Sequence, residues 1–370
     1  MGLKILVINP GSTSIKVSVF DGDDRVFSVN IHHSADELMK YPTVNSQLPF
    51  RMRIVSGALA EAGVDLSEMD AIVGRGGITY SMESGTYEIE PLIVAHAREA
   101  VTGVHHPANL GVQIADELCR RYGVRGFFVN PPVVDEYQEL ARTTGIKGIY
   151  RKPVTHALNL KETAIRHAKL TGAKYDERNY IGAHLGGGIS ITAHRRGRMV
   201  DAINCTDGEG PMAATRCGGI VVKDLIDYME RRGLSCDDVR ELCVKTGGFV
   251  DHLGTSDAKE VEERAYAGDE TALKLWNTLI YQVGKTIGSM AAVLQGKVDG
   301  ILLSGGMVKS KNLVSQIEDY CGWIAPVTAY PGEFEMEALA AGAMRALTGE
   351  EEVRKYTGVP VWGETYVGAL

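Results

Sequence analysis

The most informative stretch of this chain is residues 5–20, which read ILVINPGSTSIKVSVF. An apolar run at 5–8 leads into a loop of small residues at 9–14, and apolar and polar residues alternate from 15 to 20. Alternation with a period of two is typical of a half-buried strand, so this stretch predicts two strands joined by a loop. Glycine lets such a loop approach an anion closely, and serine hydroxyls with loop N–H groups can surround phosphate oxygens.

The same local design returns at residues 180–193, which read YIGAHLGGGISITA. Here an apolar strand runs into glycines at 186–188, and a second alternating strand follows. The repetition predicts two related lobes, and two such loops facing one another would grip the phosphates of a nucleotide. Taken singly, each loop has a simpler alternative, which is a hairpin turn rich in small residues.

Composition limits the classes of protein that this chain can represent. Its 370 residues, 44% of them hydrophobic and 23% charged, suggest two globular domains. The net charge of −8 argues against a nucleic-acid partner, which needs a basic surface. No apolar run approaches the roughly 18 residues of a membrane span, and the chain enters a strand at once, leaving no room for a signal peptide.

The six cysteines form no C-x-x-C pair and lie mostly in apolar or helical contexts. We therefore expect reduced, mainly structural thiols in a cytoplasmic protein. They are Cys119, Cys205, Cys217, Cys236, Cys243 and Cys321.

Strands and helices alternate through both halves of the sequence, which predicts an α/β protein. No low-complexity linker separates the halves, so we place the domain boundary near residue 150. Besides the two hairpins, the predicted strands are 25–31, 71–73, 126–129, 199–203, 300–303 and 327–330; the main predicted helices are 47–62, 107–122, 133–143, 153–169, 221–231, 236–245, 271–295 and 335–348.

Two arginines stand among glycines. Arg75 follows a predicted strand in GRGG at 74–77, and Arg216 lies in TRCGG at 215–219. A guanidinium binds carboxylate or phosphate through two parallel hydrogen bonds, so the pair could neutralise a carboxylate and a transferring phosphoryl group. A surface arginine in a loop is the alternative for each.

Histidines lie at the ends of predicted elements, at His105, His156 and His184. No i, i+4 pair or Cys/His cluster supports a zinc site, so imidazole donors to phosphate oxygens are the more plausible use. Taken singly, each histidine is better interpreted as a surface or core residue.

Other short patterns are weaker. There is no G-x-x-x-x-G-K-[ST] loop, and no G-x-G-x-x-G opens a helix after a strand, which argues against a P-loop protein and a dinucleotide fold. The turn at 304–306 (SGG), between a predicted strand and a predicted helix, could seat a base or ribose. Asp257 could serve there or cap a helix. Glu333, Glu335 and Glu337 could all complement the dipole of the helix that they open, and Mg²⁺ would need one of them.

Seven stretches of the sequence, taken together and in their order along the chain, resemble the acetate and butyrate kinase family, within the superfamily of actin, Hsp70 and the sugar kinases. The resemblance covers essentially the whole chain, and HALN with the Gly-Gly-Gly loop makes it look nearest to the butyrate and branched-chain fatty acid kinases. The stretches are NPGSTSIK at 9–16, VGRGG at 73–77, HHPANL at 105–110, HALN at 156–159, AHLGGG at 183–188, DGEGP at 207–211 and PGE at 331–333.

The resemblance implies two ribonuclease-H-like domains of the actin-like ATPase fold, with the nucleotide and Mg²⁺ in a cleft between them. Residues 1–150, completed by a C-terminal helix at 339–370, would form one domain, and residues 151–338 the other. It further implies transfer of a phosphoryl group between ATP and a short-chain carboxylate such as butyrate, giving an acyl phosphate and ADP. The implied assembly is a homodimer or a larger even homo-oligomer.

Residue roles carry over by position. Arg75 and Arg216 resemble the pair that holds the carboxylate and stabilises the transition state, with His156 and His184 near the transferring phosphoryl and His105 close by. Glu337 resembles the acid that holds Mg²⁺, although Glu335 is near enough in sequence to compete. Residues that resemble the phosphate loops and the adenosine site are Asn9, Ser12, Ser14, Lys16, Gly186, Gly187, Gly188, Asp257, Gly305 and Gly306.

One position departs from the family pattern. The family usually has an aspartate directly after the predicted strand 126–129. This chain has Asn130 at that position, within VNPP at 129–132. Asparagine keeps the shape but removes a charge that would organise Mg²⁺ or an arginine. The departure leaves open a rival interpretation, a nucleotide-binding homologue with impaired turnover that acts as a sensor or scaffold.

The implied chemistry suits these residues. An ordinary carboxyl group has a pKa of about 4.3 and is ionised at neutral pH, so no general base is needed to create the nucleophile. Catalysis then depends on alignment and on cancelling charge on the phosphoryl oxygens.

Overall fold

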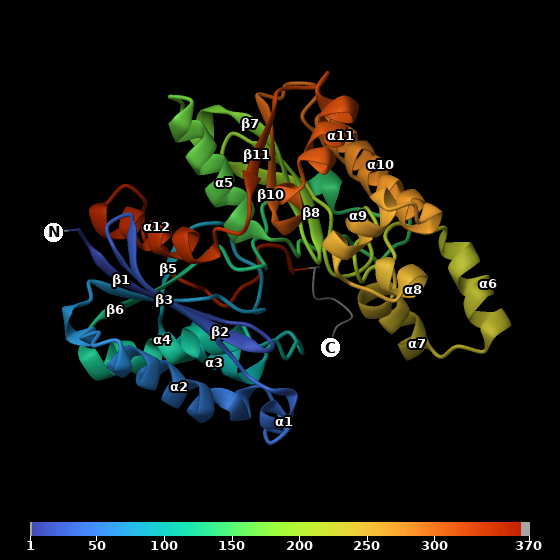
Figure 1. Ribbon diagram of the computed structural model, residues 1–370. Coiled ribbons are helices and arrows are strands. Elements are labelled where there is room, and N and C mark those ends of the chain that lie inside the picture. Colours follow the sequence, from blue (N-terminus) through green and yellow to red (C-terminus); the bar gives the residue numbers. More distant parts are fainter. Residues whose placement is uncertain (1, 364–370) are drawn as a thin grey trace. The chain divides into compact units, whose positions relative to one another are not determined.

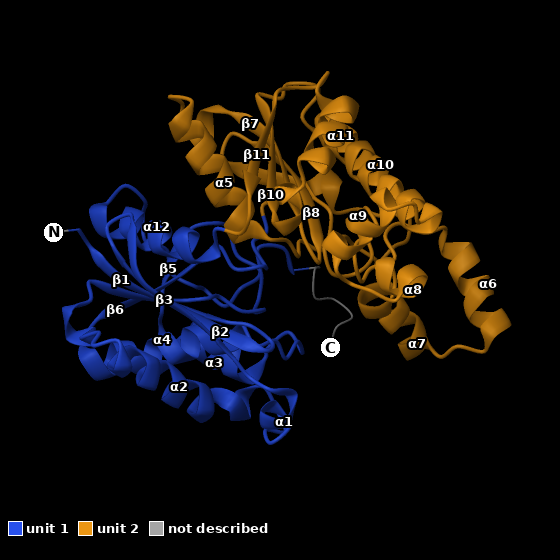
Figure 2. Ribbon diagram, viewed as in Figure 1, with its two compact units in different colours: residues 1–135, 334–370 blue, residues 136–333 orange. Residues whose placement is uncertain are grey.

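The structure is a computed structural model, and it describes residues 2–363 (Figure 1). The chain divides into two compact units: unit 1 is residues 1–135 with 334–370, and unit 2 is residues 136–333 (Figure 2). Each unit is a sheet flanked by helices, as the α/β pattern of the sequence predicted.

Unit 1 contains a six-stranded sheet in the order β3-β2-β1-β4-β6-β5. β1 pairs antiparallel with β2 and parallel with β4, and β4 pairs parallel with β6. Its strands are β1 (Lys4–Pro10), β2 (Ser14–Asp21), β3 (Asp24–His32), β4 (Ala71–Gly74), β5 (Thr86–Glu88) and β6 (Arg125–Val129). Its helices are α1 (Ala35–Leu38), α2 (Leu48–Glu61), α3 (Pro91–Glu99), α4 (Asn109–Tyr122) and α12 (Glu335–Thr348).

Unit 2 contains a five-stranded sheet in the order β11-β10-β7-β8-β9. Its strands are β7 (Asn179–Leu185), β8 (Ile189–Arg195), β9 (Arg198–Ala202), β10 (Gly300–Gly305) and β11 (Val327–Pro331). Its helices are α5 (Ala157–Leu170), α6 (Val222–Arg232), α7 (Cys236–Glu241), α8 (Phe249–Leu253), α9 (Ala258–Tyr266), α10 (Glu270–Val293) and α11 (Lys311–Cys321).

The two sheets share one topology, which confirms the duplication inferred from the two hairpins. β7 pairs antiparallel with β8 and parallel with β10, and β10 pairs parallel with β11, so β7, β8, β9, β10 and β11 repeat the arrangement of β1, β2, β3, β4 and β6. The carboxyl ends of the parallel strands meet at one edge of each sheet. That edge is where ligands bind in open α/β sheets.

Helices cover both faces of each sheet. In unit 1 the apolar side chains of Leu6 and Ile8 join a core with α2 and α4, and α12 packs against β1, β4 and β6 on the opposite face (Figure 1). In unit 2 α10 packs against β7, β8 and β9, while α5 packs against β7 and β10. One face of the sheet in unit 1 is therefore covered by a helix, α12, that the C-terminal part of the chain supplies.

Two expected helices differ from those observed. Residues 133–143 were expected to be helical, and this prediction is wrong, because only a short 3-10 turn forms at Glu139–Ala141. The N–H of Asp135 donates to Met82 O at 2.8 Å instead, so a long-range backbone pairing replaces the local helix. Of the expected C-terminal helix at 339–370, α12 accounts for the part up to Thr348, where Gly349 (φ 76°) ends it, and residues 364–370 lie outside the described residues.

Among residues 2–363, no helix combines the length and the apolar character that crossing a bilayer requires.

Candidate active site

In unit 1 the predicted phosphate-loop residues lie on one hairpin. Asn9 and Lys16 are directly opposite partners on β1 and β2, and the turn between them carries Ser12 and Ser14. Arg51 of α2 holds the backbone of this turn, because its guanidinium donates to Ser14 O at 3.1 Å and to Ser12 O at 3.2 Å. Arg51 is fully buried, and this burial lowers its pKa. The structure thus adds a residue that the sequence analysis missed, and its only signal was an arginine within the apolar face of a predicted helix.

Arg75, at the end of β4, is joined to this hairpin through a carboxylate. Its Nη1 donates to Glu335 Oε1 at 2.6 Å, and Asn9 Nδ2 donates to Glu335 Oε2 at 2.8 Å. The Arg75 guanidinium and these hydrogen bonds lower the pKa of Glu335 to about 2, so its carboxylate is ionised throughout the physiological range. The cluster of Asn9, Arg75 and Glu335 brings together β1, β4 and the start of α12.

Glu337, the acid named for Mg²⁺ from the resemblance, lies elsewhere. Its Oε1 is 3.3 Å from Nη1 of Arg25 on β3. Glu335 rather than Glu337 therefore contacts the predicted site residues Asn9 and Arg75. The two acids lie in the same first turn of α12, so the sequence pattern alone could not separate them.

The motifs at 74–77 and 105–110 fit against each other. Asn109 Oδ1 accepts a hydrogen bond from Ile78 N at 2.7 Å, and a side chain at Gly77 would collide with Asn109. His105 is exposed. His106 is exposed as well, and its Nδ1 accepts from Ala108 N at 3.1 Å. Surrounding protein atoms, and then the Arg75 charge, lower the pKa of His106.

Asn130 lies at the end of β6 with φ 39°, a left-handed conformation that asparagine tolerates better than most residues. Its backbone N–H donates to Gly85 O at 3.1 Å, and its Oδ1 accepts from Gly85 N at 2.8 Å. One side-chain oxygen is thus enough for this contact, and an aspartate at this position could make it as well.

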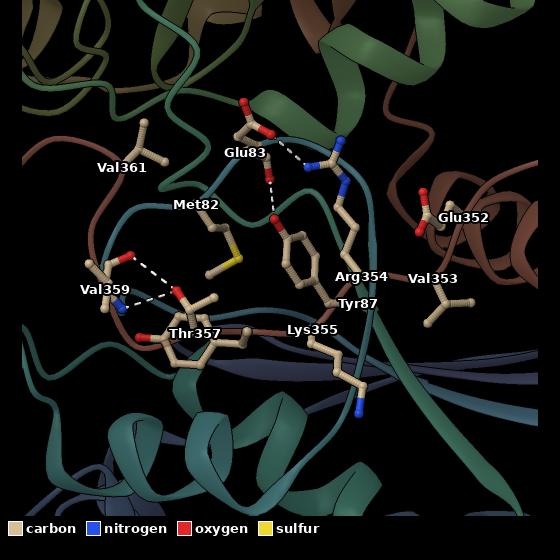
Figure 3. Close-up of a pocket in the computed structure, with 11 residues that line it drawn as sticks. Met82, Glu83, Tyr87, Glu352, Val353, Arg354, Lys355, Thr357, Val359 and Val361 are labelled. Atoms are coloured by element: carbon tan, nitrogen blue, oxygen red, sulfur yellow. Dashed lines mark hydrogen bonds and ion pairs between the residues drawn. The ribbon is translucent and has the colours of Figure 1, made fainter.

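Beyond Gly85 lies a pocket of about 650 Å³ along residues 352–361 (Figure 3). Arg354 crosses beside Gly85 and pairs with Glu83 at 2.8 Å, while the Tyr87 hydroxyl donates to Glu83 O. The pocket gathers none of the residues predicted for the active site.

In unit 2 two predicted histidines are stacked on each other. The rings of His156 and His184 have centroids 4.3 Å apart with an interplanar angle of 28°. Ser190, the strand partner of His184, lies 2.8 Å from His156 Nδ1, and Ser304 lies 3.3 Å from His184 Nδ1. Each imidazole is therefore oriented through its Nδ1 by a serine. Sequence reasoning did not single out Ser190, and it placed Ser304 in the SGG turn without a contact to His184.

Arg216 lies over the glycine turn at 186–188. Its Nη1 donates to Gly187 O at 2.8 Å and to Thr215 Oγ1 at 3.0 Å. Its Nε is buried, and within residues 2–363 it finds no hydrogen-bond partner. A guanidinium held in this way has donor capacity left for an anion.

A pocket of about 330 Å³ in unit 2 collects four of the predicted nucleotide-binding residues, Gly186, Gly187, Asp257 and Gly306. Asp257 caps α9, accepting from Lys259 N at 2.9 Å, so the helix-cap interpretation of this residue is confirmed. Gly305, which was also predicted, has φ 99° and exchanges two backbone hydrogen bonds with Gly332. Trp276 lines the same pocket, and its indole N–H is buried with no partner in the described part of the chain.

Within residues 2–363, no three His, Cys, Asp or Glu side chains gather as a metal-binding group. Mg²⁺ commonly keeps several waters and binds protein carboxylates and phosphates, and the ionised, partly exposed Glu335 fits this role.

Comparison with known proteins places this geometry in a family. A profile of the acetokinase family matches residues 140–321. A probable butyrate kinase of Clostridium botulinum (strain Alaska E43 / Type E3) is 41% identical over 356 residues, which cover 96% of this chain and all of that protein. Butyrate kinase 1 of Clostridium acetobutylicum is 39% identical over 353 residues, covering 95% of this chain and 99% of its own.

Solved structures agree on the fold. The crystal structure of Porphyromonas gingivalis acetate kinase matches with a TM-score of 0.78 and 23% identity, covering 94% of this chain and all of that one. A propionate kinase from Francisella tularensis matches with a TM-score of 0.73 and 18% identity, covering 92% of this chain and 98% of its own. With near-complete relatives at about 40% identity, the chain belongs to the acetokinase family.

Proposed function

We propose that this protein is a kinase that transfers the terminal phosphoryl group of ATP, reversibly, to a short-chain carboxylate such as butyrate. The observation that carries the proposal is that each unit presents a Gly/Ser loop after its first strand with a guanidinium fixed beside it. These are Arg75, held beside Asn9 by Glu335, and Arg216, held on Gly187. Relatives named butyrate kinase over nearly the full chain support the same activity.

Unit 2 is proposed to bind the nucleotide. The pocket beside Gly186, Gly187 and Gly306 contains a glycine turn, and backbone N–H groups in such turns favour anions. The unpartnered indole N–H of Trp276 is a donor for the nucleoside part. Asp257 shapes the pocket as the cap of α9, and Gly305 and Gly188 are proposed to shape its backbone.

The reaction needs one bond made and one broken at phosphorus. A carboxylate oxygen attacks the γ-phosphorus, the bond to the oxygen bridging the β- and γ-phosphates breaks, and the products are an acyl phosphate and ADP. No proton is transferred, because the carboxylate is already ionised at neutral pH. The protein's task is alignment and compensation of the negative charge on the transferring group.

Charge compensation is assigned to residues of both units. Arg75 is proposed to orient the carboxylate, helped by His105 or, from its position beside Arg75, by His106. Arg216 supplies its unpartnered N–H to the phosphoryl oxygens, and His156 and His184 present their Nε2 atoms while Ser190 and Ser304 fix the rings. Ser12, Ser14 and Lys16 are proposed to contact phosphates from the unit 1 hairpin.

Glu335, rather than Glu337, is the acid proposed for Mg²⁺, because it is the one that contacts Asn9 and Arg75. When bound, Mg²⁺ would neutralise charge on the phosphate oxygens. Arg75 and Asn9 keep the Glu335 carboxylate ionised and fix its orientation.

The rival function, an impaired ATP-binding homologue, has Asn130 as its only support, and the contact of Asn130 with Gly85 uses an oxygen that both residue types possess. Further proposals carried over from the family are a homodimer or larger even assembly, which light scattering would measure, and a place in the cytoplasm, where ATP is supplied.

The test is a coupled assay of acyl phosphate formation with ATP and Mg²⁺. Values of kcat/KM for acetate, propionate, butyrate, isobutyrate and hexanoate should peak at a short chain. Absence of ATP-dependent product with every acid would refute the proposal.

A further inference from the structure

Two cysteines that lie 26 positions apart in the sequence are neighbours beside Arg216. The Cys217 N–H donates to Cys243 O at 3.1 Å, and the Cys217 thiol donates to Gly218 O at 3.2 Å. Gly208 packs against both residues: a methyl group there would lie 3.1 Å from Cys217 Sγ and 3.9 Å from Cys243 Cβ. The backbone hydrogen bond and this packing thus hold the two cysteine residues next to each other.

Cys243 lies in an unusual backbone segment. Residues Leu242–Thr246 form a π-helix, a rare conformation that often occurs at functional sites. The segment ends at Gly247 and Gly248, which pack backbone against backbone on the loop of Arg216: a side chain at Gly247 would meet Cys217 N at 3.0 Å, and one at Gly248 would meet Arg216 O at 2.8 Å. No side chain separates the backbone of Gly247 and Gly248 from the backbone of residues 216–217. We therefore expect a displacement of residue 243 to be transmitted to residues 216–217.

The thiol pair is accessible to small molecules. Cys217 and Cys243 both line a pocket of about 420 Å³, and both are half-buried. Of the remaining cysteines, Cys205 and Cys321 are buried, Cys236 is exposed on α7, and Cys119 is half-buried on α4. Burial, and then the adjacent Cys243 sulfur, raise the pKa of Cys217 to about 12, so Cys217 stays a thiol at neutral pH.

We propose that Cys217 and Cys243 are a reversible oxidation site, at which a small-molecule disulfide forms an intramolecular disulfide that displaces Arg216. The Cys243 thiolate attacks one sulfur of the small disulfide, releasing one thiolate and leaving a mixed disulfide. The Cys217 sulfur then displaces the second small thiol, and its proton passes to the released thiolate. In sum, two protein thiols and one small disulfide give one protein disulfide and two small thiols.

The proposed bond would act on the backbone next to Arg216. A disulfide fixes the sulfur atoms at about 2.05 Å, and Cys217 directly follows Arg216, so we expect the constraint to reach the loop of Arg216. The hydrogen bond from Arg216 to Gly187 O depends on that loop. Resting on the proposed kinase function, we infer that oxidation lowers turnover, because misplacement of a charge-compensating group by about 1 Å can cost roughly 100-fold.

The experiment uses the full chain, reduced, desalted and then incubated with oxidised glutathione. Intact mass should fall by two hydrogen masses, and a peptide map should show Cys217 linked to Cys243. Turnover should fall about 10- to 100-fold and return with dithiothreitol. Cys243→Ser and Cys217→Ser should each abolish the internal disulfide and the loss of turnover, whereas the matched variant Cys236→Ser should retain both.

Failure of this proposal is distinguishable from failure of the proposed function. No internal disulfide, or one that joins other cysteines, overturns the oxidation site even if the kinase is fully active. An internal 217–243 disulfide with unchanged turnover overturns the coupling to Arg216. If the reduced chain shows no kinase activity, the mass change and altered hydrogen exchange at 213–218 still test the site without reference to catalysis.

Discussion

Arg75 and Glu335 are separated by 260 positions in the sequence, yet their side chains form an ion pair of 2.6 Å. The pair joins the carboxyl end of β4 to the first turn of α12, and Asn9 of β1 closes the cluster. Because α12 completes unit 1, the C-terminal part of the chain supplies both a structural layer and an acid of the proposed site. The cluster therefore exists only when α12 is packed on the sheet of unit 1.

The first prediction separates the two acids of α12. Glu335→Gln should lower kcat/KM for MgATP by about 100-fold or more, because it removes the charge beside Arg75 and Asn9. Glu337→Gln, the matched change two residues away, should remain within about threefold, since Glu337 pairs with the partly exposed Arg25. The measurement is steady-state kinetics over a titration of Mg²⁺. The reverse ranking of the two variants would return the metal role to Glu337.

The second prediction concerns acid stability. The pKa of Glu335 is about 2 in the folded protein and near 4.5 when unfolded, so its contribution is fully present above pH 4.5 and is lost as the pH falls toward 2. The Glu335 side chain is 23% exposed, so about 2 to 3 kcal/mol is the upper range of that contribution. Urea unfolding at pH 6 should show the parent chain more stable than Glu335→Gln, and the gap should narrow by pH 3. A gap that does not change with pH would mean that the ion pair does not hold the carboxylate ionised.

Much of the fold could be predicted from sequence because local patterns agreed with the final structure. The alternating residues after each Gly/Ser loop became β2 and β8, and the duplicated hairpins gave two sheets of one topology. Where a long-range contact overrides the local pattern, prediction failed. Residues 133–143 have helical spacing, but the N–H of Asp135 pairs with Met82, far away in the sequence.

The site was predicted at the level of motifs and less well within them. His105 and His106 are adjacent, and the acids of α12 lie two positions apart. Only the structure shows that Glu335 pairs with Arg75 and that the Arg75 charge acts on the pKa of His106. Arg51 was missed because its role is set by the backbone carbonyls of a loop on another element, which no residue pattern records.

The third prediction tests Arg51 as the support of the phosphate loop. Arg51→Met should destabilise the protein by about 2 to 4 kcal/mol, because Ser12 O and Ser14 O lose a charged donor. It should also raise KM for ATP, since the loop backbone is no longer fixed. Arg53→Met, on the exposed face of the same helix, is the control and should change stability by less than about 0.5 kcal/mol. Equal effects of the two variants in urea unfolding would remove Arg51 from this role.

The fourth prediction concerns Arg216. Arg216→Ala should lower kcat by about 100- to 1,000-fold with a smaller change in KM, as expected for a donor used in the transition state. Arg216→Lys should recover little, because a lysine cannot hold Gly187 O and also donate to a phosphoryl oxygen through a planar fork. Circular dichroism and ADP affinity check that the fold and the nucleotide pocket persist. A variant with unchanged kcat would contradict the assignment of Arg216 to the transition state.

The last prediction addresses Asn130. The chain as it stands should turn over butyrate, and Asn130→Asp should unfold at nearly the same urea concentration, because the oxygen that accepts from Gly85 N is retained. Its turnover should lie within about tenfold of the parent, since one added carboxylate changes charge near the site without moving the backbone at φ 39°. Asn130→Ala is the contrast: it removes the acceptor and places alanine in a left-handed conformation, so it should lose roughly 1 to 3 kcal/mol of stability. A parent chain that binds ADP without turnover, together with an Asn130→Asp variant that turns over butyrate, would instead establish the sensor or scaffold interpretation. The missing charge, rather than a folding defect, would then account for the lack of activity.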